Sequence, residues 1–367
     1  LDRSSAASDV YKRQVHDTFT GERIQRLYPS GGTWTARVAG VDESSLNFIA
    51  EAQGFDTRAE ARAAFNNLFD ADRRFIVVSW GDHIESATFN RVPVYDMSNG
   101  TFDVSGRGIR TFAAERSTFG VNNYINGDLT IATRTRSAAA SLIWQRLTQW
   151  NPEWNLPVDV PANASGTYSR TIKRDEMVTG ESLFRAIEDQ GFEIGFRPYF
   201  TASYGVRWQL LVQPQIAIGS AIDVPLSVEK PAATGVTVTD DSSKRLTGVF
   251  YVGQGHGEDT ITAWAGSPNG RPIRDSFRYA KDIRDQAALQ AMADAAFAAE
   301  RLPVRQWSLS VDAGEDFSPA LVAPGRLLDM AVADDWWIAD GIYRQRVVSV
   351  RGSYGSLTLN PEVQAYG

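Results

Sequence analysis

Acidic residues lie close together at three places where the sequence also predicts a turn. The three places are Asp240-Asp241, Asp312 with Glu315 and Asp316, and Asp334-Asp335. Carboxylate oxygens at such short spacing are ligands that Ca²⁺ accepts. None of the three places has the twelve-residue loop pattern of a calcium-binding helix-loop-helix motif, and acidic residues are common in exposed turns. We therefore expect solvated hairpin turns and no metal site.

The rest of the sequence contains no motif of a nucleophilic, metal-binding or nucleotide-binding site. The three histidines, His16, His83 and His256, have no neighbours at the spacing of a metal motif such as HExxH. The chain has no cysteine, so it can form no disulfide, thiolate metal site or cysteine nucleophile. No GxSxG pattern marks a nucleophilic serine. The glycine-rich run at 253–257 lacks GxGxxG spacing, so we expect a turn there and no nucleotide.

Sugar chemistry is the remaining candidate. A glycoside hydrolase needs two carboxylates roughly 5–9 Å apart, and nothing singles out such a pair among the 44 acidic residues. Trp144, Trp150 and Trp154 could form a sugar platform, but two of them share one predicted helix, where a core role is more common. Adjacent Trp336 and Trp337 would point to opposite faces of a strand, so both cannot enter one core. We take Trp336 and Trp337 as candidate interface residues and expect no catalytic, cofactor or metal residue.

Composition is that of a globular protein. The chain has 367 residues, 43% hydrophobic and 22% charged, which suits two or three domains with full-sized cores. A formal net charge of −7 does not favour specific nucleic-acid binding. No apolar run approaches the ~20 residues of a membrane-spanning helix, so no membrane span is expected.

The first fourteen residues are predicted to be foreign to the protein. Ser4–Gln14, SSAASDVYKRQ, matches the in-frame translation of a transposase adapter used in short-read sequencing libraries. We therefore expect residues 1–14 to be a sequencing-adapter artefact that takes no part in the fold, with native residues missing before Val15. Deleting residues 1–14 is expected to leave solubility and melting temperature unchanged.

Side-chain periodicity predicts a helix followed by a β-hairpin between residues 179 and 214. Thr179 can cap the helix, and Gly191 ends it as a residue with positive φ does. Beyond Gly191 hydrophobic residues alternate, which predicts two strands joined by a turn at 202–205. Capping patterns predict two more helices, one behind Thr57 and one behind Asp285.

The remaining segments predict an α+β fold that is predominantly β. We expect three domains after residue 14. Residues 15–135 form a first β-barrel domain with one helix, residues 136–225 an inserted α+β module, and residues 226–367 a second β-barrel domain with one long helix.

Several short motifs occur in a fixed order along residues 15–367. They are DTFTG at 17–21, GTW at 32–34, GRG at 106–108, the helix at 138–150, TGESLFRAIEDQGFEIGFRP at 179–198, LPVR at 302–305, PG at 324–325, YRQRV at 343–347 and LTL at 357–359. This ordered set resembles the minor tail proteins, or tail-hub proteins, of phages with long non-contractile tails, especially phages of actinobacteria. One departure is Arg326, where the family often has Asp after Pro-Gly.

The resemblance implies a structural virion protein at the tail tip of a siphovirus, assembled in the host cytoplasm, and no enzyme. Such hubs look like two tail-tube-like β-barrels with an α+β insertion, and three copies form a pseudo-sixfold ring on the tail tube. The implied partners are the distal tail protein, the tape-measure protein and the receptor-binding or fibre proteins of the baseplate. A carbohydrate-binding host-adsorption module and a tail-associated cell-wall hydrolase are the alternatives, and the host and receptor stay open.

Overall fold

In the computed structural model, the strand β5 (Arg74–Trp80) is buried on both faces. Phe75 and Val77 enter one hydrophobic core, and Ile76 enters another. Burial on both faces explains why this strand is a continuous apolar run and does not alternate. The strand therefore joins the two cores of the first part of the chain.

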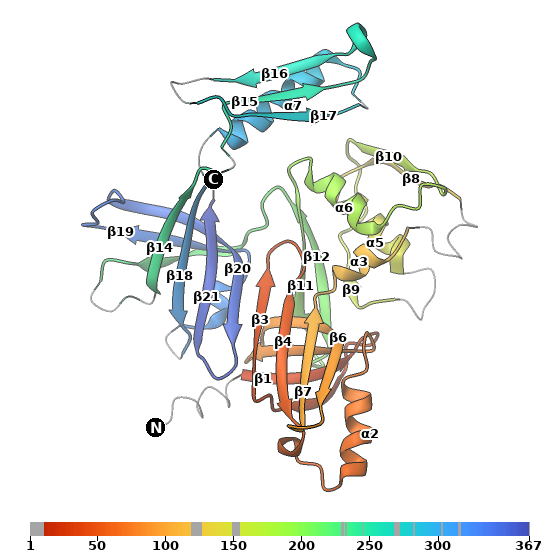
Figure 1. Cartoon of the computed structure of the whole chain (residues 1–367), viewed down its shortest axis with the longest axis vertical. Coiled ribbons are helices and arrows are strands. Elements are labelled where there is room, and N and C mark those ends of the chain that lie inside the picture. The colour runs from red at the N-terminus through yellow and green to blue at the C-terminus, as the bar shows by residue number, and fades with distance from the viewer. Residues whose placement is uncertain are drawn as a thin grey trace. The chain divides into compact units, whose positions relative to one another are not determined.

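Two compact units make up the chain (Figure 1). One contains residues 1–235 and 309–367, and the other contains residues 236–308. The boundaries expected at 135 and 225 fall within the first unit and remain predictions. The structure describes residues 11–118, 127–148, 155–228, 231, 233–243, 245–267, 272–281, 283–301, 304–314 and 317–366.

Thirteen strands pair into one sheet. The main path through it runs β14-β18-β21-β20-β3-β4-β7-β6-β5-β1-β2, while β19 pairs with β20 and, in parallel, with β13. The strands other than β5 are β1 (Tyr11–Asp17), β2 (Arg23–Leu27), β3 (Gly31–Arg37), β4 (Glu43–Ile49), β6 (His83–Asp96), β7 (Thr101–Arg107), β13 (Ile218–Pro225), β14 (Ala233–Asp241), β18 (Val304–Asp312), β19 (Arg326–Val332), β20 (Gly341–Ser353) and β21 (Thr358–Ala365).

The described strands of this sheet do not close into a barrel, because β14 and β2 end its path without pairing to each other. The α+β, predominantly β class is confirmed, and the division into two tail-tube-like β-barrel domains stays a prediction. Strands from the two expected barrels join edge to edge, where β3 pairs antiparallel with β20. An edge strand exposes unpaired N–H and C=O groups, so this join satisfies both edges at once.

The helix and hairpin predicted at 179–214 are confirmed and share a core with the sheet. Thr179 accepts a hydrogen bond from the N–H of Ser182 at 3.3 Å. Trp208 packs on Phe75 and Phe89, with ring centroids 4.9 and 5.3 Å apart. The elements of this region are β8 (Leu129–Arg134), α5 (Arg136–Thr148), β9 (Val158–Asp159), β10 (Tyr168–Ile172), α6 (Gly180–Glu188), β11 (Glu193–Phe200) and β12 (Val206–Gln213). They form the sheets β11-β12-β9 and β10-β8.

The helix expected behind Thr57 is α2 (Arg58–Leu68), and Thr57 accepts a hydrogen bond from the N–H of Glu60 at 3.1 Å. Its Phe65 and Leu68 pack in the second core. The other short helices of the first unit are η1 (Glu51–Gln53), α3 (Thr111–Glu115) and η4 (Pro319–Val322).

The second unit places a helix against a three-stranded sheet. Its central strand is β15 (Gly248–Val252), which pairs antiparallel with β16 (Thr262–Gly266) and parallel with β17 (Asp275–Tyr279). The helix expected behind Asp285 is α7 (Gln286–Glu300), and Leu289 and Ala293 bury its inner side. Asp285 accepts from the N–H of Ala288 at 2.8 Å. The turn η3 (Gly257–Asp259) follows β15.

The structure extends β1 back to Tyr11, which pairs with Trp80 of β5. Tyr11 is buried, and its ring packs edge-on against Trp34 and Trp80 at 5.5 and 4.9 Å. The expectation that residues 1–14 take no part in the fold therefore does not hold for Tyr11–Gln14. Strand pairing uses main-chain groups, which any sequence supplies. Residues 1–10 lie outside the described residues, and the origin of 1–14 remains a prediction.

Candidate functional site

Trp336 and Trp337, the candidate interface residues, lie in the loop between β19 and β20. Trp336 is fully exposed and Trp337 is 63% exposed. Ile342, at the start of β20, is 72% exposed. Large apolar side chains exposed together are typical of a surface that meets a partner. The structure thus places both indoles at the surface of one hairpin loop.

Asp335 holds the conformation of this loop. Its Oδ1 accepts hydrogen bonds from the N–H groups of Ile338 at 2.7 Å and Trp337 at 2.9 Å, and these bonds lower the pKa of Asp335. Asp334 has a φ of 57°, and its N–H donates to Asp340 Oδ1 at 2.9 Å. The pair Asp334-Asp335 therefore serves as a turn, as its sequence suggests.

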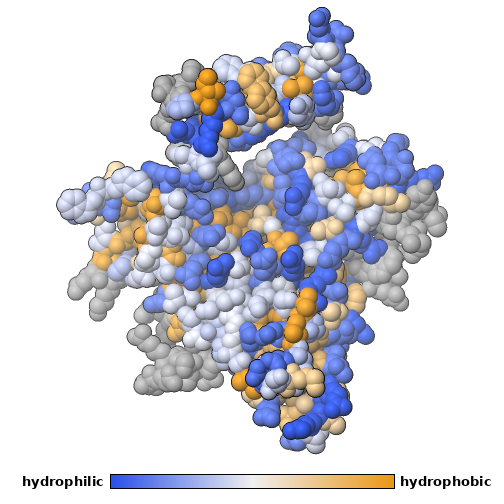
Figure 2. Space-filling model, viewed as in Figure 1, coloured by the Kyte–Doolittle hydropathy of each residue, from blue (hydrophilic) through white to orange (hydrophobic). Residues whose placement is uncertain are grey.

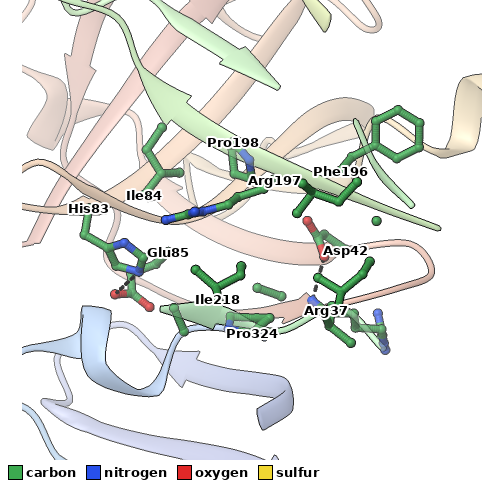
Figure 3. A pocket seen from close by; sticks show the side chains of 16 residues that line it. Arg37, Asp42, His83, Ile84, Glu85, Phe196, Arg197, Pro198, Ile218 and Pro324 are labelled. Atoms are coloured by element: carbon green, nitrogen blue, oxygen red, sulfur yellow. Dashed lines mark hydrogen bonds and ion pairs between the residues drawn. The ribbon is translucent and has the colours of Figure 1, made fainter. Parts of the chain in front are cut away.

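A cavity of about 50 Å³ lies within the first unit, between β3, β6, β11 and the segment before β19 (Figure 3). Glu85 is 5% exposed, and its Oε1 lies 3.5 Å from Nε2 of His83. Figure 3 shows His83 and Glu85 together at one end of the cavity and Asp42 beside Arg37 at the other. The N–H of Arg37 donates to Asp42 Oδ1 at 2.8 Å.

Burial dominates the titration of these groups. It raises the pKa of Glu85 to about 8 and that of Asp42 to about 7, although the hydrogen bond from Arg37 opposes the second shift. Burial also lowers the pKa of His83 to about 4, and the positive charges of Arg197 and Arg326 act in the same direction. Because the charged forms are disfavoured, Glu85 and His83 are both neutral at pH 7.

This set of groups makes a poor active site. The residues described as lining the cavity include no serine, cysteine or lysine that could act as a nucleophile. A volume of this size holds only a few water molecules. Within the described part of the chain, no group of three His, Asp or Glu side chains could hold a metal ion.

The other residues considered from the sequence are dispersed. His16 is buried in β1 and stacks on Phe75 at 5.3 Å, whereas His256 lies in the other unit. Asp240 accepts from Arg305, and Asp312 accepts from Thr358 at 2.7 Å. Each of these acidic residues therefore has a structural partner.

Trp144 is a core residue and no sugar platform. It is 1% exposed and packs on Phe196 with ring centroids 4.8 Å apart. Trp150, Trp154, Glu315 and Asp316 lie outside the described residues. The run at 253–257 connects β15 to η3, and its Gly255 and Gly257 have φ values of 125° and 59°, as expected of turn glycines.

Sequence reasoning missed the cavity. Its one local signal is Glu85 itself, a carboxylate inside a strand segment that is otherwise built for burial. Asp42 and Arg197 come from distant parts of the sequence, and no periodic pattern links them to Glu85. Their meeting depends on the packing of β11 against the sheet.

Comparison with solved structures relates the whole chain to phage tail proteins. It aligns with the tail protein from Neisseria meningitidis MC58 over 97% of both chains, at 14% identity and a TM-score of 0.61. It also aligns with the 43 kDa tail protein of prophage MuSo2 from Shewanella oneidensis, over 97% of this chain and 98% of that one, at 10% identity and a TM-score of 0.61.

The chain has the fold of these tail proteins. A third tail-protein structure, prophage gp18 from Listeria monocytogenes, aligns over 97% of this chain and 94% of that one, at 10% identity and a TM-score of 0.51. No protein-family model and no curated protein matches the sequence. Among the described residues, no helix of this tail-protein fold has the length and apolar character needed to cross a membrane.

Proposed function

We propose that the chain is a structural virion protein, the hub that links the tail tube to the tip and to the receptor-binding proteins. The likeness over 97% of both chains to two tail proteins carries this proposal. At 14% and 10% identity that likeness shows the fold alone. The tail-tip position, the siphovirus type and an actinobacterial host therefore rest on the ordered motifs in residues 15–367.

A homotrimer is part of the proposal. Because the sheet does not close into two barrels, a pseudo-sixfold ring cannot be argued from paired barrels. The support is instead that β2 and β14 end the main path of described strands and that the side chains of Trp336 and Trp337 are exposed. Open strand edges and exposed aromatic residues are features that subunit interfaces cover.

The proposed partners are the distal tail protein, the tape-measure protein and the receptor-binding or fibre proteins. We propose no enzymatic role, since the residues described as lining the cavity beside Glu85 include no serine, cysteine or lysine nucleophile. Zymography on actinobacterial peptidoglycan is expected to show no clearing. Clearing that disappears in a Glu85→Gln variant would favour the cell-wall hydrolase instead.

Solution mass tests the hub proposal. Light scattering of the full chain across a concentration series is expected to give a trimer, or a monomer that moves to a trimer as concentration rises. A dimer as the end state would contradict the ring. A strict monomer at every concentration would remove the trimer from the proposal and favour an adsorption module.

A further inference from the structure

The second unit exposes one face of its sheet, and that face carries a row of aromatic side chains. Successive residues of a strand point to opposite faces, so alternate residues of β15, β16 and β17 point away from α7. Among them, Trp264, Phe250 and Phe277 lie side by side across the three strands. Phe277 is 68% exposed and Trp264 is 46% exposed. Helix α7 passes behind the strands in Figure 1, and Figure 2 shows hydrophobic side chains on the face toward the viewer.

The three rings lie in a row, in which Phe250 and Phe277 stack on each other and Trp264 is tilted. Phe250 and Phe277 stack with centroids 5.2 Å apart and an interplanar angle of 13°. Phe250 and Trp264 lie 6.1 Å apart. Since neighbouring strands are about 4.8 Å apart, the row is roughly 10 Å across.

Beside this row, two glycines let the indole of Trp264 lie close to the sheet. A Cβ atom at Gly266 would stand 2.4 Å from Cζ2 of Trp264. A Cβ atom at Gly248 would stand 2.8 Å from the indole Nε1 and 2.6 Å from Oδ1 of Asp275. An N–H donor and a carboxylate acceptor therefore approach the same point above Gly248, next to the rings.

We propose that this face binds a neutral glycan. The C–H groups of a pyranose ring carry partial positive charge, which the negative face of an aromatic ring attracts. Oδ1 of Asp275 and the indole N–H of Trp264 are neighbours beside the rings, so a sugar hydroxyl above them can donate to the first and accept from the second. The carboxylate of Asp275 would repel phosphate or sulfate groups, so a neutral chain fits this end of the face better than a polyanion.

The opposite end of the face carries one cation. Nζ of Lys281 lies 5.9 Å from the centroid of Tyr279, which is 73% exposed and lies two residues beyond Phe277. Asp275 and Lys281 thus lie on opposite sides of the row of rings. This arrangement suits a chain of hydroxyl groups that crosses the rings.

The area and the edge of the sheet argue against a second protein chain. Three strands of five residues present a face of roughly 10 by 17 Å, whereas a stable protein interface buries about 800 Å² on each partner. Gln286 and Gln290 of α7 donate to the carbonyl oxygens of Thr262 and Trp264 at 2.8 and 2.9 Å. These bonds occupy acceptors on the edge strand β16, which an added strand would otherwise use.

Isothermal titration calorimetry of the full chain with N-acetylchitohexaose, cellohexaose and mannohexaose tests the proposal. We expect at least one hexasaccharide to bind. Trp264→Ala should weaken that binding by about tenfold, as expected for loss of one aromatic stacking contact. Phe277→Ala should weaken it as well. Tyr28→Ala removes a 55% exposed aromatic ring elsewhere and should leave the affinity unchanged.

Three results would overturn the proposal. They are no binding of any hexasaccharide, binding that Trp264→Ala and Phe277→Ala leave intact, and binding that Tyr28→Ala weakens equally. If Trp264→Ala changes the mass measured by light scattering while no glycan binds, the face is a contact between copies. Thermal unfolding of each variant checks folding, which should be preserved because these side chains are exposed. The glycan test does not depend on the trimer.

Discussion

The guanidinium of Arg110 donates to both carboxylate oxygens of Glu188, at 2.7 and 2.8 Å. It also donates to both oxygens of Glu181, at 2.9 and 3.0 Å, and to the carbonyl oxygen of Ile194 at 3.0 Å. Arg110 is 4% exposed. One buried side chain therefore joins the segment before α3 to both ends of α6 and to β11.

We predict that Arg110→Ala lowers the free energy of unfolding by about 3–5 kcal/mol, because Glu188 loses its ion pair with Arg110 and Glu181 keeps only the exposed Arg185. Chemical denaturation measures this loss. Arg185→Ala is the matched control: Arg185 also donates to Glu181, at 3.0 Å, but its side chain is 71% exposed. Its removal should cost less than about 1 kcal/mol. Equal losses for the two variants would contradict the role given to Arg110.

Arg13 is a buried charge with incomplete hydrogen bonding. It is 3% exposed, and neither Nε nor Nη2 has a hydrogen-bond partner among the described residues. Burial lowers its pKa to about 10. The guanidinium lies 5.2 and 4.9 Å from the ring centroids of Tyr11 and Tyr354, which compensates only partly for lost hydration.

Arg13→Val is therefore expected to raise the free energy of unfolding by about 1–3 kcal/mol, because it removes unsatisfied donors from the interior. Thermal and urea unfolding measure the gain. Lys12→Val, one residue away on the exposed side of β1, should change stability little. If residues 1–14 are foreign to the protein, Arg13 was not selected for this buried position, which also predicts a gain in stability on its replacement. A loss of stability would show that the strand depends on the arginine.

Glu85 makes stability depend on pH. Its pKa of about 8 in the folded chain lies above the ordinary value of 4.5, so the folded state holds the proton more tightly. Stability from this group is fully present below about pH 4.5 and is lost as pH rises through 8. Glu85→Gln lacks this titration. Between pH 4.5 and 8, the free energy of unfolding of Glu85→Gln should therefore rise relative to that of the parent, by at most about 1.4 kcal/mol per pH unit.

Urea unfolding from pH 5 to 9 checks this dependence. Asp42→Asn supplies a comparison, since burial raises the pKa of Asp42 to about 7 from an ordinary 3.8. The stability difference between Asp42→Asn and the parent should stop rising about one pH unit below the point at which that of Glu85→Gln stops. A difference between Glu85→Gln and the parent that stays constant with pH would show that Glu85 is not held protonated.

Replacing both Trp336 and Trp337 by serine should leave the melting temperature within about 2 °C of the parent, because both side chains are exposed. The same change should weaken trimer formation or binding to a tail partner, as measured by light scattering and co-purification. Met97→Ser removes an 86% exposed apolar side chain at another hairpin and serves as the control. Normal assembly of the double variant would remove this loop from the interface.

Local elements were predictable from the sequence because their signals are local. The caps Thr57, Thr179 and Asp285 each accept the expected main-chain hydrogen bond. Gly191 has a φ of 84°, as a helix-ending glycine should. Alternation after Gly191 also predicts the hairpin of β11 and β12.

Long-range pairing was not predictable in the same way. The join of β3 to β20 and the parallel pairing of β13 with β19 depend on which edges meet in three dimensions. The aromatic face of the second unit was not predicted from the sequence, because it forms only when β15, β16 and β17 pair. In particular, β17, which supplies Phe277, is short and lies between loops, so its sequence carries no clear strand signal.

The pairing of β3 with β20 also has a consequence for synthesis on the ribosome. One edge of β3 pairs with β4 soon after both emerge, but the other edge waits for Gly341–Ser353. At roughly 5–20 residues per second, the intervening stretch of about 300 residues takes about 15–60 s to translate. During that interval the unpaired edge of β3 can pair with the same edge of chains that emerge from neighbouring ribosomes. Slower translation would lengthen this interval and so favour aggregation.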